Sequence, residues 1–397
     1  MKKHFHIITL LSLFFLNVSL SKVSAQSDLS SVNFVYQYDP KGELFVNYRI
    51  SNKANTDSLE LICQLVLNDA KASVTNYHFS VYQASSYKEK LVNQVPVNSS
   101  FIGSRGNSHF WSFSFAAVEP SKILVLEIVS SLSQIRYYYD IISSEISPIR
   151  LADQSKVPIV KSWLQPDEFC ISQRPGTALY YAHDFKPALP PMVTRNPAPG
   201  KELKIDSMFS IVPSNRFALR KPGLNLLQKD TSDVSGLTIL SVDKYFPKAA
   251  KLDQLIAPLI YITTKEEWIK LASGNVEKKD FDKFWMDMTK SQTRAKKIIK
   301  VYYDRVEEAN QFFTTYKEGW KTDKGLIYIV FGLPDQITRI GDKEIWRYDD
   351  SQEGPMLEFE FLRVNSVFSA QHYVLIREKK YANAWFRGVN TLRKVRF

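Results

Sequence analysis

Two aspartates, Asp323 and Asp335, flank a short apolar run, and a pair of carboxyl groups can serve as acid and base in hydrolysis. If that run, Leu326 to Phe331, is a strand, a rise of about 3.3 Å per residue places the two carboxylates roughly 20 Å apart. Working carboxylate pairs lie within about 10 Å of each other. We therefore expect each aspartate to shape a turn or a cap.

The remaining groups that could do chemistry show no metal or cofactor signature. Beyond residue 25 the histidines are His78, His109, His183 and His372, and the sequence contains no H-E-x-x-H, C-x-x-C or phosphate-binding glycine loop. The acidic segment Asp349 to Gly354 lacks the spacing of a calcium loop. We expect no metal and no cofactor, and we assign no catalytic residue, although a serine nucleophile would need no local signature.

An aromatic group surrounds the same stretch. Trp320, Trp346 and Tyr348 could line a groove for a peptide or a sugar, because flat rings offer a large contact area around a few polar groups. Alternatively, the two tryptophans fill the core between a helix and a sheet while Thr322 and Asp323 fix the turn. We favour the core role.

Turn residues frame these side chains. Gly325, following Asp323, can adopt a positive φ, and the apolar run after it is typical of a central strand covered on both faces. Gly332 and Pro334 would end that strand. The candidate motif or binding surface comprises Gly319, Trp320, Thr322, Asp323, Gly325, Gly332, Pro334, Asp335, Trp346 and Tyr348.

Several short motifs in order, from about residue 255 to 365, resemble the GWxTD domain, a family of exported bacterial proteins. They are Phe281 to Trp285, Tyr302 to Val306 with Ala309 and Asn310, Gly319 to Asp323, Tyr328 to Asp335, and Glu344 to Tyr348. Leu333 departs from the second proline or small residue usual there in the family, and the segment after Trp285 lacks the Arg-Asp-Pro that the family often shows. The resemblance implies a fold but brings no established activity.

The elements around the motif predict an α+β domain over residues 251–380. Helices are expected from Thr264, over Glu277 to Met288, and over a long stretch that buries Ile298 to Tyr316 and ends at Gly319 as a C-cap. The basic cluster 294–300 is read as the polar face of that helix. About five sequential antiparallel strands should follow, including 336–340, 344–348, 356–364 and 367–376, and the basic tail 381–397 is expected to be peripheral.

The pattern of the preceding region, residues 26–147, predicts an immunoglobulin-like β-sandwich. Apolar residues at each odd position from Leu59 to Leu67 have the period of two that buries one face of a strand. Strands are expected over 32–38, 44–50, 59–67, 77–82, 110–115, 123–129 and 135–141. Residues 148–250 suggest a small second β domain or connector with a proline-rich segment at 187–199.

The first 25 residues predict a cleavable signal peptide. Lysines precede a short apolar run and a Val-Ser-Ala site, so cleavage is expected after Ala25 and the protein is expected to be periplasmic or secreted, with no later transmembrane segment. Cleavage lowers the net charge from +11 to +8. Cys63 and Cys170 could pair in an oxidising compartment, although buried free cysteines are common.

These observations favour an exported, non-catalytic interaction or scaffold protein of the cell envelope. Export makes nucleic acid a poor partner for the basic surface, so we expect another envelope protein or an anionic envelope polymer. The alternative is an envelope hydrolase or polysaccharide-processing enzyme with an interdomain site near residues 319–335. A cleft that gathers Asp323 or Asp335 with a second carboxylate or a histidine would favour this alternative.

Overall fold

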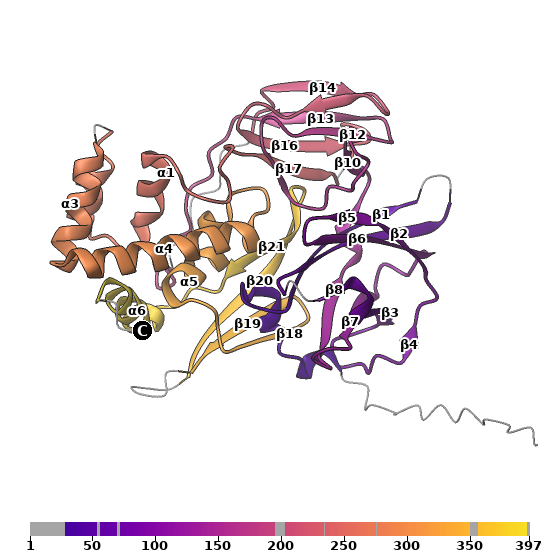
Figure 1. Cartoon of the computed structure of the whole chain (residues 1–397), viewed down its shortest axis with the longest axis horizontal. Helices are drawn as coiled ribbons and strands as arrows, with labels where there is room; N and C mark the ends of the chain where they lie inside the picture. Colours follow the sequence, from indigo (N-terminus) through magenta and orange to yellow (C-terminus); the bar gives the residue numbers. More distant parts are fainter. Residues whose placement is uncertain are drawn as a thin grey trace, which may run out of the picture.

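The structure, a computed structural model, describes residues 28–53, 56–69, 72–194, 203–233, 235–274, 276–349 and 356–394. The expected signal peptide and most of the acidic segment 349–354 lie outside these residues. The chain is multidomain, with β-sheets in its N-terminal and middle parts and an α+β part at its C-terminal end (Figure 1).

Two sheets form the N-terminal part and pack face to face around a shared apolar core. Every odd position from Leu59 to Leu67 is buried in that core, which confirms the expected alternation. In spatial order the first sheet is β5 (Asn98–Arg105), β6 (Ser108–Ala116), β2 (Ser58–Leu67), β1 (Leu44–Asn52) and β9 (Ile146–Ser147). The second is β4 (Asn93–Gln94), β3 (Tyr77–Ala84), β7 (Ile123–Ser130) and β8 (Arg136–Ile141).

The middle part is also a pair of sheets with a small core of its own. One consists of β10 (Leu151–Asp153), β12 (Phe169–Ser172) and β15 (Arg216–Ala218). The other is β11 (Trp163–Leu164), β17 (Leu237–Ser241), β16 (Gly223–Gln228), β13 (Gly176–Tyr181) and β14 (Ser207–Ile211). Figure 1 shows this part above the other two, so all three parts meet near the centre of the molecule.

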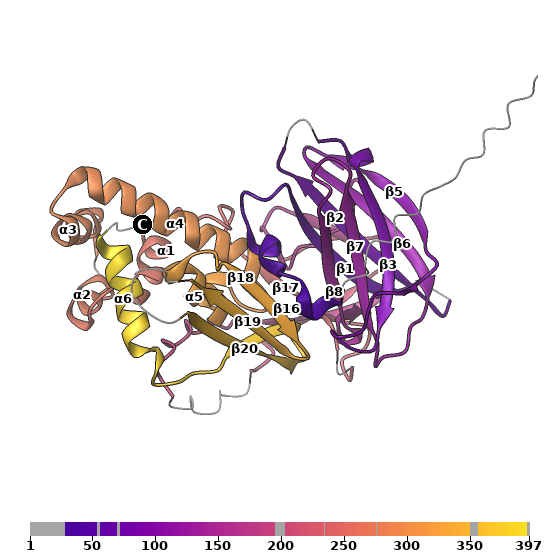
Figure 2. The ribbon, with the colours of Figure 1, turned by 90° about the horizontal axis from the view of Figure 1, so that it is seen from below.

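The C-terminal part places helices against a four-stranded antiparallel meander (Figure 2). Its strands are β18 (Gln336–Ile340), β19 (Lys343–Tyr348), β20 (Leu357–Ser366) and β21 (Ser369–Leu375). Its helices are α1 (Leu252–Ile256), α2 (Lys265–Leu271), α3 (Lys278–Thr289), α4 (Gln292–Phe313), α5 (Asp323–Phe331) and α6 (Tyr381–Lys394), with 3-10 turns η5 (Ala257–Tyr261) and η6 (Gly319–Lys321). Thr264 and Glu267 form the expected capping box.

The segment after the motif is the helix α5, so the expected central strand is wrong. Thr322 caps the helix, because its hydroxyl accepts a hydrogen bond from the Gly325 N–H at 3.0 Å. Gly325 is helical and has no positive φ. Residues from Leu326 to Val330 are buried on every side of the helix. A short run without polar residues carries no period that separates a buried helix from a buried strand.

Two further expectations about the helices are wrong. Helix α4 ends at Phe313 with Thr314 as its C-cap, and Gly319 instead begins the 3-10 turn η6. The basic tail is not peripheral, because it forms α6 and buries Tyr381, Trp385 and Leu392. Arg387 and Lys394 are exposed, whereas Arg393 donates to the Ile262 carbonyl and pairs with Glu267, and these basic residues obscure the apolar stripe in the sequence.

The segment expected as the first strand, 32–38, is the 3-10 turn η2 (Phe34–Tyr38), which follows the turn η1 (Leu29–Ser31). Asn33 caps η2 and also accepts a hydrogen bond from the Ile337 N–H at 2.9 Å. Phe34 and Tyr38 belong to the core of the C-terminal part. The first described residues of the chain therefore cover the edge of β18 instead of extending an N-terminal sheet, as Figure 2 shows.

Cys63 and Cys170 are free and buried in the cores of two different parts, so they form no disulfide bond. Within the described residues no helix is both long and apolar enough to cross a membrane.

Candidate functional site

The aromatic residues of the motif lie in the core. Trp346 is fully buried, and Trp320 and Tyr348 are each less than a tenth exposed. The indole of Trp320 meets the Tyr261 ring edge to face, while the Trp346 ring contacts Phe313 of α4 and Phe361 of β20. This placement confirms the expected core role and leaves these rings no groove in which to bind a ligand.

Thr322 and Asp323 hold the turn that precedes α5. The Thr322 hydroxyl donates to the Gly319 carbonyl at 2.7 Å while it caps the helix. The Asp323 carboxylate accepts from the Leu375 N–H at 2.7 Å and from two nitrogens of Arg377, at 2.5 and 3.1 Å. These bonds tie the motif to the end of β21, so the aspartate does not act as a free acid or base.

Two glycines of the motif allow backbone segments to touch. A Cβ atom on Gly319 would lie 1.8 Å from the Ala309 carbonyl oxygen of α4, and one on Gly325 would lie 2.0 Å from the Gly319 carbonyl oxygen. Neither position has room for a larger residue. Close packing of η6 between α4 and α5 therefore explains both glycines.

The second half of the motif ends α5. Gly332, at a φ of +84°, is its C-cap, and its carbonyl accepts from the Tyr348 hydroxyl at 3.0 Å. Pro334 is buried, and the Asp335 carboxylate accepts from the Asp349 N–H at 2.7 Å. Asp323 and Asp335 thus lie at opposite ends of a helix with separate partners, and they are not brought together.

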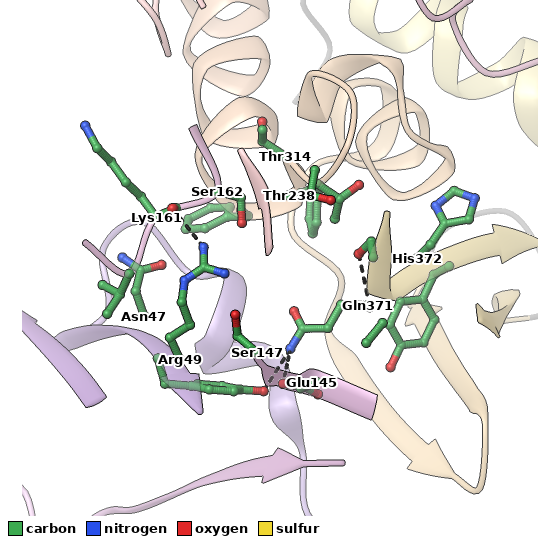
Figure 3. A pocket seen from close by; sticks show the side chains of 18 of the residues that line it. Asn47, Arg49, Glu145, Ser147, Lys161, Ser162, Thr238, Thr314, Gln371 and His372 are labelled. Carbon is green, nitrogen blue, oxygen red and sulfur yellow. Dashed lines mark hydrogen bonds between the residues drawn. The ribbon is translucent and has the colours of Figure 1, made fainter. Parts of the chain in front are cut away.

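The main cavity of the described structure, of about 840 Å³, lies where the three parts of the chain meet. We call it the interdomain pocket. It is lined by β1 and β9 of the N-terminal part, by β11 and β17 of the middle part, and by β21 and the end of α4 in the C-terminal part (Figure 3). Thr322 and Lys324 of the motif also line it, whereas Asp323 and Asp335 do not.

A buried ion network forms the floor of this pocket. Glu344, fully buried, accepts from Arg339 Nε at 2.8 Å and from Lys324 Nζ at 2.8 Å. The Trp346 indole N–H donates to the same carboxylate at 2.7 Å. Arg339 also pairs with Asp140 of β8, which joins the N-terminal sheets to the C-terminal domain.

The pKa values on the floor follow from this arrangement. Burial opposes the charge on Glu344, but Lys324 and Arg339 outweigh burial and hold the pKa of that carboxyl at about 2. Burial also lowers the pKa of Lys324 to about 8, against the attraction of Glu344. The carboxylate of Glu344 is therefore charged across the physiological range and carries the network.

The wall of the pocket is arranged differently. Arg49 of β1 directs its guanidinium into the pocket and donates one hydrogen bond, from Nη2 to the Lys161 carbonyl at 2.9 Å (Figure 3). Glu145 accepts from the Gln371 side-chain N–H at 3.0 Å, and that same nitrogen donates to the Tyr48 hydroxyl at 2.9 Å. These residues come from three elements far apart in the sequence.

The titratable groups of the wall are shifted towards their neutral forms. Burial, reinforced by the nearby Asp140 carboxylate, raises the pKa of Glu145 to about 7. Burial, together with the positive charge of Lys317, lowers the pKa of His372 to about 4. Near neutral pH the wall therefore carries the charge of Arg49, a half-ionised Glu145 and a neutral imidazole.

The sequence does not indicate the residues that line the wall, because its candidate functional residues all lie at the motif. The only local signal is a charged residue within a strand, Arg49 between Tyr48 and Ile50. No group of three metal-ligating side chains occurs among the described residues, and His78, His109, His183 and His372 do not form one.

The fold defines the class of the protein as a multidomain, mostly β chain with a C-terminal α+β region. The family model of the GWxTD domain matches residues 223–394, which agrees with the resemblance that the motifs indicated. The match includes β16, β17 and α6, beyond the span of 255–365 that the motifs indicated. No curated protein matches the chain.

Proposed function

We propose that the protein is an exported, non-catalytic interaction or scaffold protein of the bacterial cell envelope that binds its partner at the interdomain pocket. One observation carries this proposal: the buried ion network joins the N-terminal and C-terminal parts beside a pocket whose wall keeps Arg49 without an ion pair among the described residues. A packed junction beside a cation that makes no ion pair suits recognition.

The role of the motif supports a binding protein. Asp323, the carboxylate that could have served catalysis, instead ties α5 to β21 through Leu375 and Arg377. The two face-to-face sheets of the N-terminal part fit an immunoglobulin-like module, which we propose as a spacer or recognition domain. The lysines and apolar run of residues 1–25 support export.

A pull-down from envelope extract tests this function, with residues 26–397 as bait. Arg49→Gln removes the charge in the pocket, and Lys88→Gln removes an exposed lysine outside its lining. We expect one partner to be retained by the unmodified protein and by Lys88→Gln but lost from Arg49→Gln, after circular dichroism shows all three to be folded. Equal retention by Arg49→Gln would place the interface elsewhere and contradict the proposal.

An envelope hydrolase or polysaccharide-processing enzyme is the second candidate, and Glu145 favours it. A carboxyl group with a pKa of about 7 inside a pocket is suited to donate a proton to a leaving group. This site differs from the one expected at residues 319–335. Release of reducing sugar from envelope polysaccharide, lost in Glu145→Gln, would establish the enzyme, whereas equal rates with and without protein would reject it.

A further inference from the structure

Unmet hydrogen-bonding capacity gathers around the interdomain pocket. Nine buried side-chain polar atoms in the described part of the chain have no hydrogen-bond partner. Five of them belong to residues that line this pocket. One is Arg363 Nε, whose residue pairs with Asp342; the other four are Arg49 Nε, Tyr139 Oη, Thr238 Oγ1 and Thr315 Oγ1. These four atoms have almost no accessible surface, so the group that reaches into the pocket is the rest of the Arg49 guanidinium, whose Nη2 donates to the Lys161 carbonyl at 2.9 Å.

The charges of the lining point to the sign of that ligand. Five cationic side chains and two carboxylates line the pocket. Lys324 and Arg339 pair with Glu344 and Asp140, Arg363 pairs with Asp342, and Lys161 pairs with Glu168. Arg49 makes no ion pair with a described residue, although the charge of Glu145 acts on it from nearby, and a planar guanidinium suits a carboxylate or a phosphate.

The neutral part of the lining points to a hydroxylated ligand. Hydroxyl and amide groups, which both donate and accept hydrogen bonds, alternate with aromatic rings that can cover the C–H face of a sugar ring. The hydroxyl and amide groups include those of Asn47, Ser147, Ser162 and Tyr48, and Trp163 supplies a ring with Lys161 Nζ over one face. Figure 3 shows several of these side chains directed at the same space as Arg49.

We propose that the interdomain pocket binds an acidic saccharide, with Arg49 engaging its carboxylate or phosphate group and the polar side chains of the lining, Ser162 among them, meeting its hydroxyl groups. This inference rests on the proposed function and names the class of ligand at the same site. A volume of about 840 Å³ is within the range of ligand pockets and leaves room for more than one sugar ring.

Titration calorimetry of residues 26–397, which contain every described residue, tests the inference. The probes are glucuronic acid, glucose 6-phosphate, glucose and inorganic phosphate. We expect one of the two acidic sugars to bind at least ten times more tightly than glucose or inorganic phosphate. The stronger of the two identifies the acidic group as carboxylate or phosphate.

Variants connect that binding to the pocket. Arg49→Gln should weaken the acidic sugar at least tenfold, and Lys88→Gln should leave it unchanged. If Arg49→Gln fails to fold, Ser162→Asp serves instead, because the Ser162 side chain lines the pocket and makes no hydrogen bond to another described residue. Ser162→Asp should weaken binding at least tenfold, whereas its neutral counterpart Ser162→Asn should not.

Several results would overturn the inference. Glucose binding as tightly as the acidic sugars would remove the role of Arg49, and inorganic phosphate binding as tightly would reduce the site to an anion site. No binding of any probe would reject the saccharide class. A partner lost from Arg49→Gln in the pull-down would in that case still support the proposed function, so the two proposals fail separately.

Discussion

At the floor of the interdomain pocket Glu344 accepts hydrogen bonds from Arg339, Lys324 and Trp346, whereas at the wall Arg49 has no carboxylate within ion-pair distance among the described residues. Both regions use charged side chains removed from bulk water. On the floor each charge has a partner in fixed geometry, so burial is tolerated. On the wall the groups shift towards neutrality or remain incompletely bonded.

The floor and the wall of the pocket therefore differ in role: the floor holds the parts of the chain together, and the wall is suited to bind a ligand. A network whose members satisfy one another has little capacity left for a ligand, and it fixes the positions of the parts it joins. A wall with unmet donors gains when a ligand supplies acceptors. The floor includes Lys324, which directly follows the GWxTD motif, and Thr322 of the motif caps α5, the helix that carries Lys324, so the motif positions part of the floor.

Glu344→Gln should produce the largest effect. Removing the carboxylate leaves Arg339 and Lys324 buried with one partner fewer, so we expect the free energy of unfolding at pH 7 to fall by about 3–5 kcal/mol. Urea unfolding measures the loss. The matched control is Glu360→Gln, which removes a surface pair with Lys343 and should cost less than about 1 kcal/mol. Equal costs would end the distinction between floor and surface.

The same carboxylate predicts the acid limb of stability. The pKa of Glu344 in the folded protein, about 2, lies below its ordinary value of 4.5. Its contribution is therefore fully present above about pH 5 and is lost as the pH falls from there towards 2. Over that interval the stability of Glu344→Gln should depend less steeply on pH than that of the unmodified protein, and parallel curves would assign the acid limb to other groups.

Trp320→Ala tests whether the motif has a structural role. Truncation of this buried ring should cost about 3–5 kcal/mol, since it opens a cavity between η6 and η5. The melting temperature measures the loss, with exposed Tyr245→Ala as the control. Saccharide binding by the remaining folded protein should persist, because Trp320 does not line the pocket. An unchanged melting temperature with lost binding would move the tryptophan into the recognition surface.

Thr322→Ala tests the cap at the start of α5. Loss of the hydroxyl that accepts from the Gly325 N–H should lower stability by about 0.5–2 kcal/mol. Thr322→Ser keeps this oxygen and should stay within about 0.5 kcal/mol of the unmodified protein by urea unfolding. If the serine variant loses as much as the alanine variant, the methyl group and not the cap stabilises this turn.

Local patterns predicted the elements that bury one face. The alternation from Leu59 to Leu67 and the capping box at Thr264 both hold in the structure, because each leaves a repeated signal along the chain. Helix α5 left none, since it is buried all round. The turn η2 was taken for a strand because its aromatic residues, Phe34 and Tyr38, serve a core more than two hundred residues away.

The pocket could not be predicted from the sequence. Arg49, Glu145 and Gln371 are brought together only by the packing of three parts of the chain, and none has a neighbour in sequence that marks it. Glycines and tryptophans are concentrated in the motif, and the two glycines are there because backbone segments pack closely around Gly319 and Gly325. The motif thus lies next to the proposed binding site, but most of its residues are not part of that site.

Glu145→Gln should have the smallest effect, with a sign opposite to that of Glu344→Gln. The pKa of Glu145 is raised from 4.5 to about 7, so the folded protein holds this proton more tightly than the unfolded chain does. The stability that Glu145 contributes is therefore present below about pH 4 and is lost as the pH rises through 7. Replacing the ionised carboxylate should raise stability at pH 8 by on the order of 1 kcal/mol, after allowance for the solvent that reaches this partly buried group.

Melting temperatures of Glu145→Gln at pH 4 and pH 8 measure this difference, with exposed Glu119→Gln as the matched control. Glu145→Gln should melt with the unmodified protein at pH 4 and above it at pH 8, while Glu119→Gln should follow the unmodified protein at both. A group kept for recognition is expected to cost stability in the absence of its ligand. If Glu145→Gln destabilised the protein at pH 8, Glu145 would belong to the structural network of the floor, and the contrast between floor and wall would be lost.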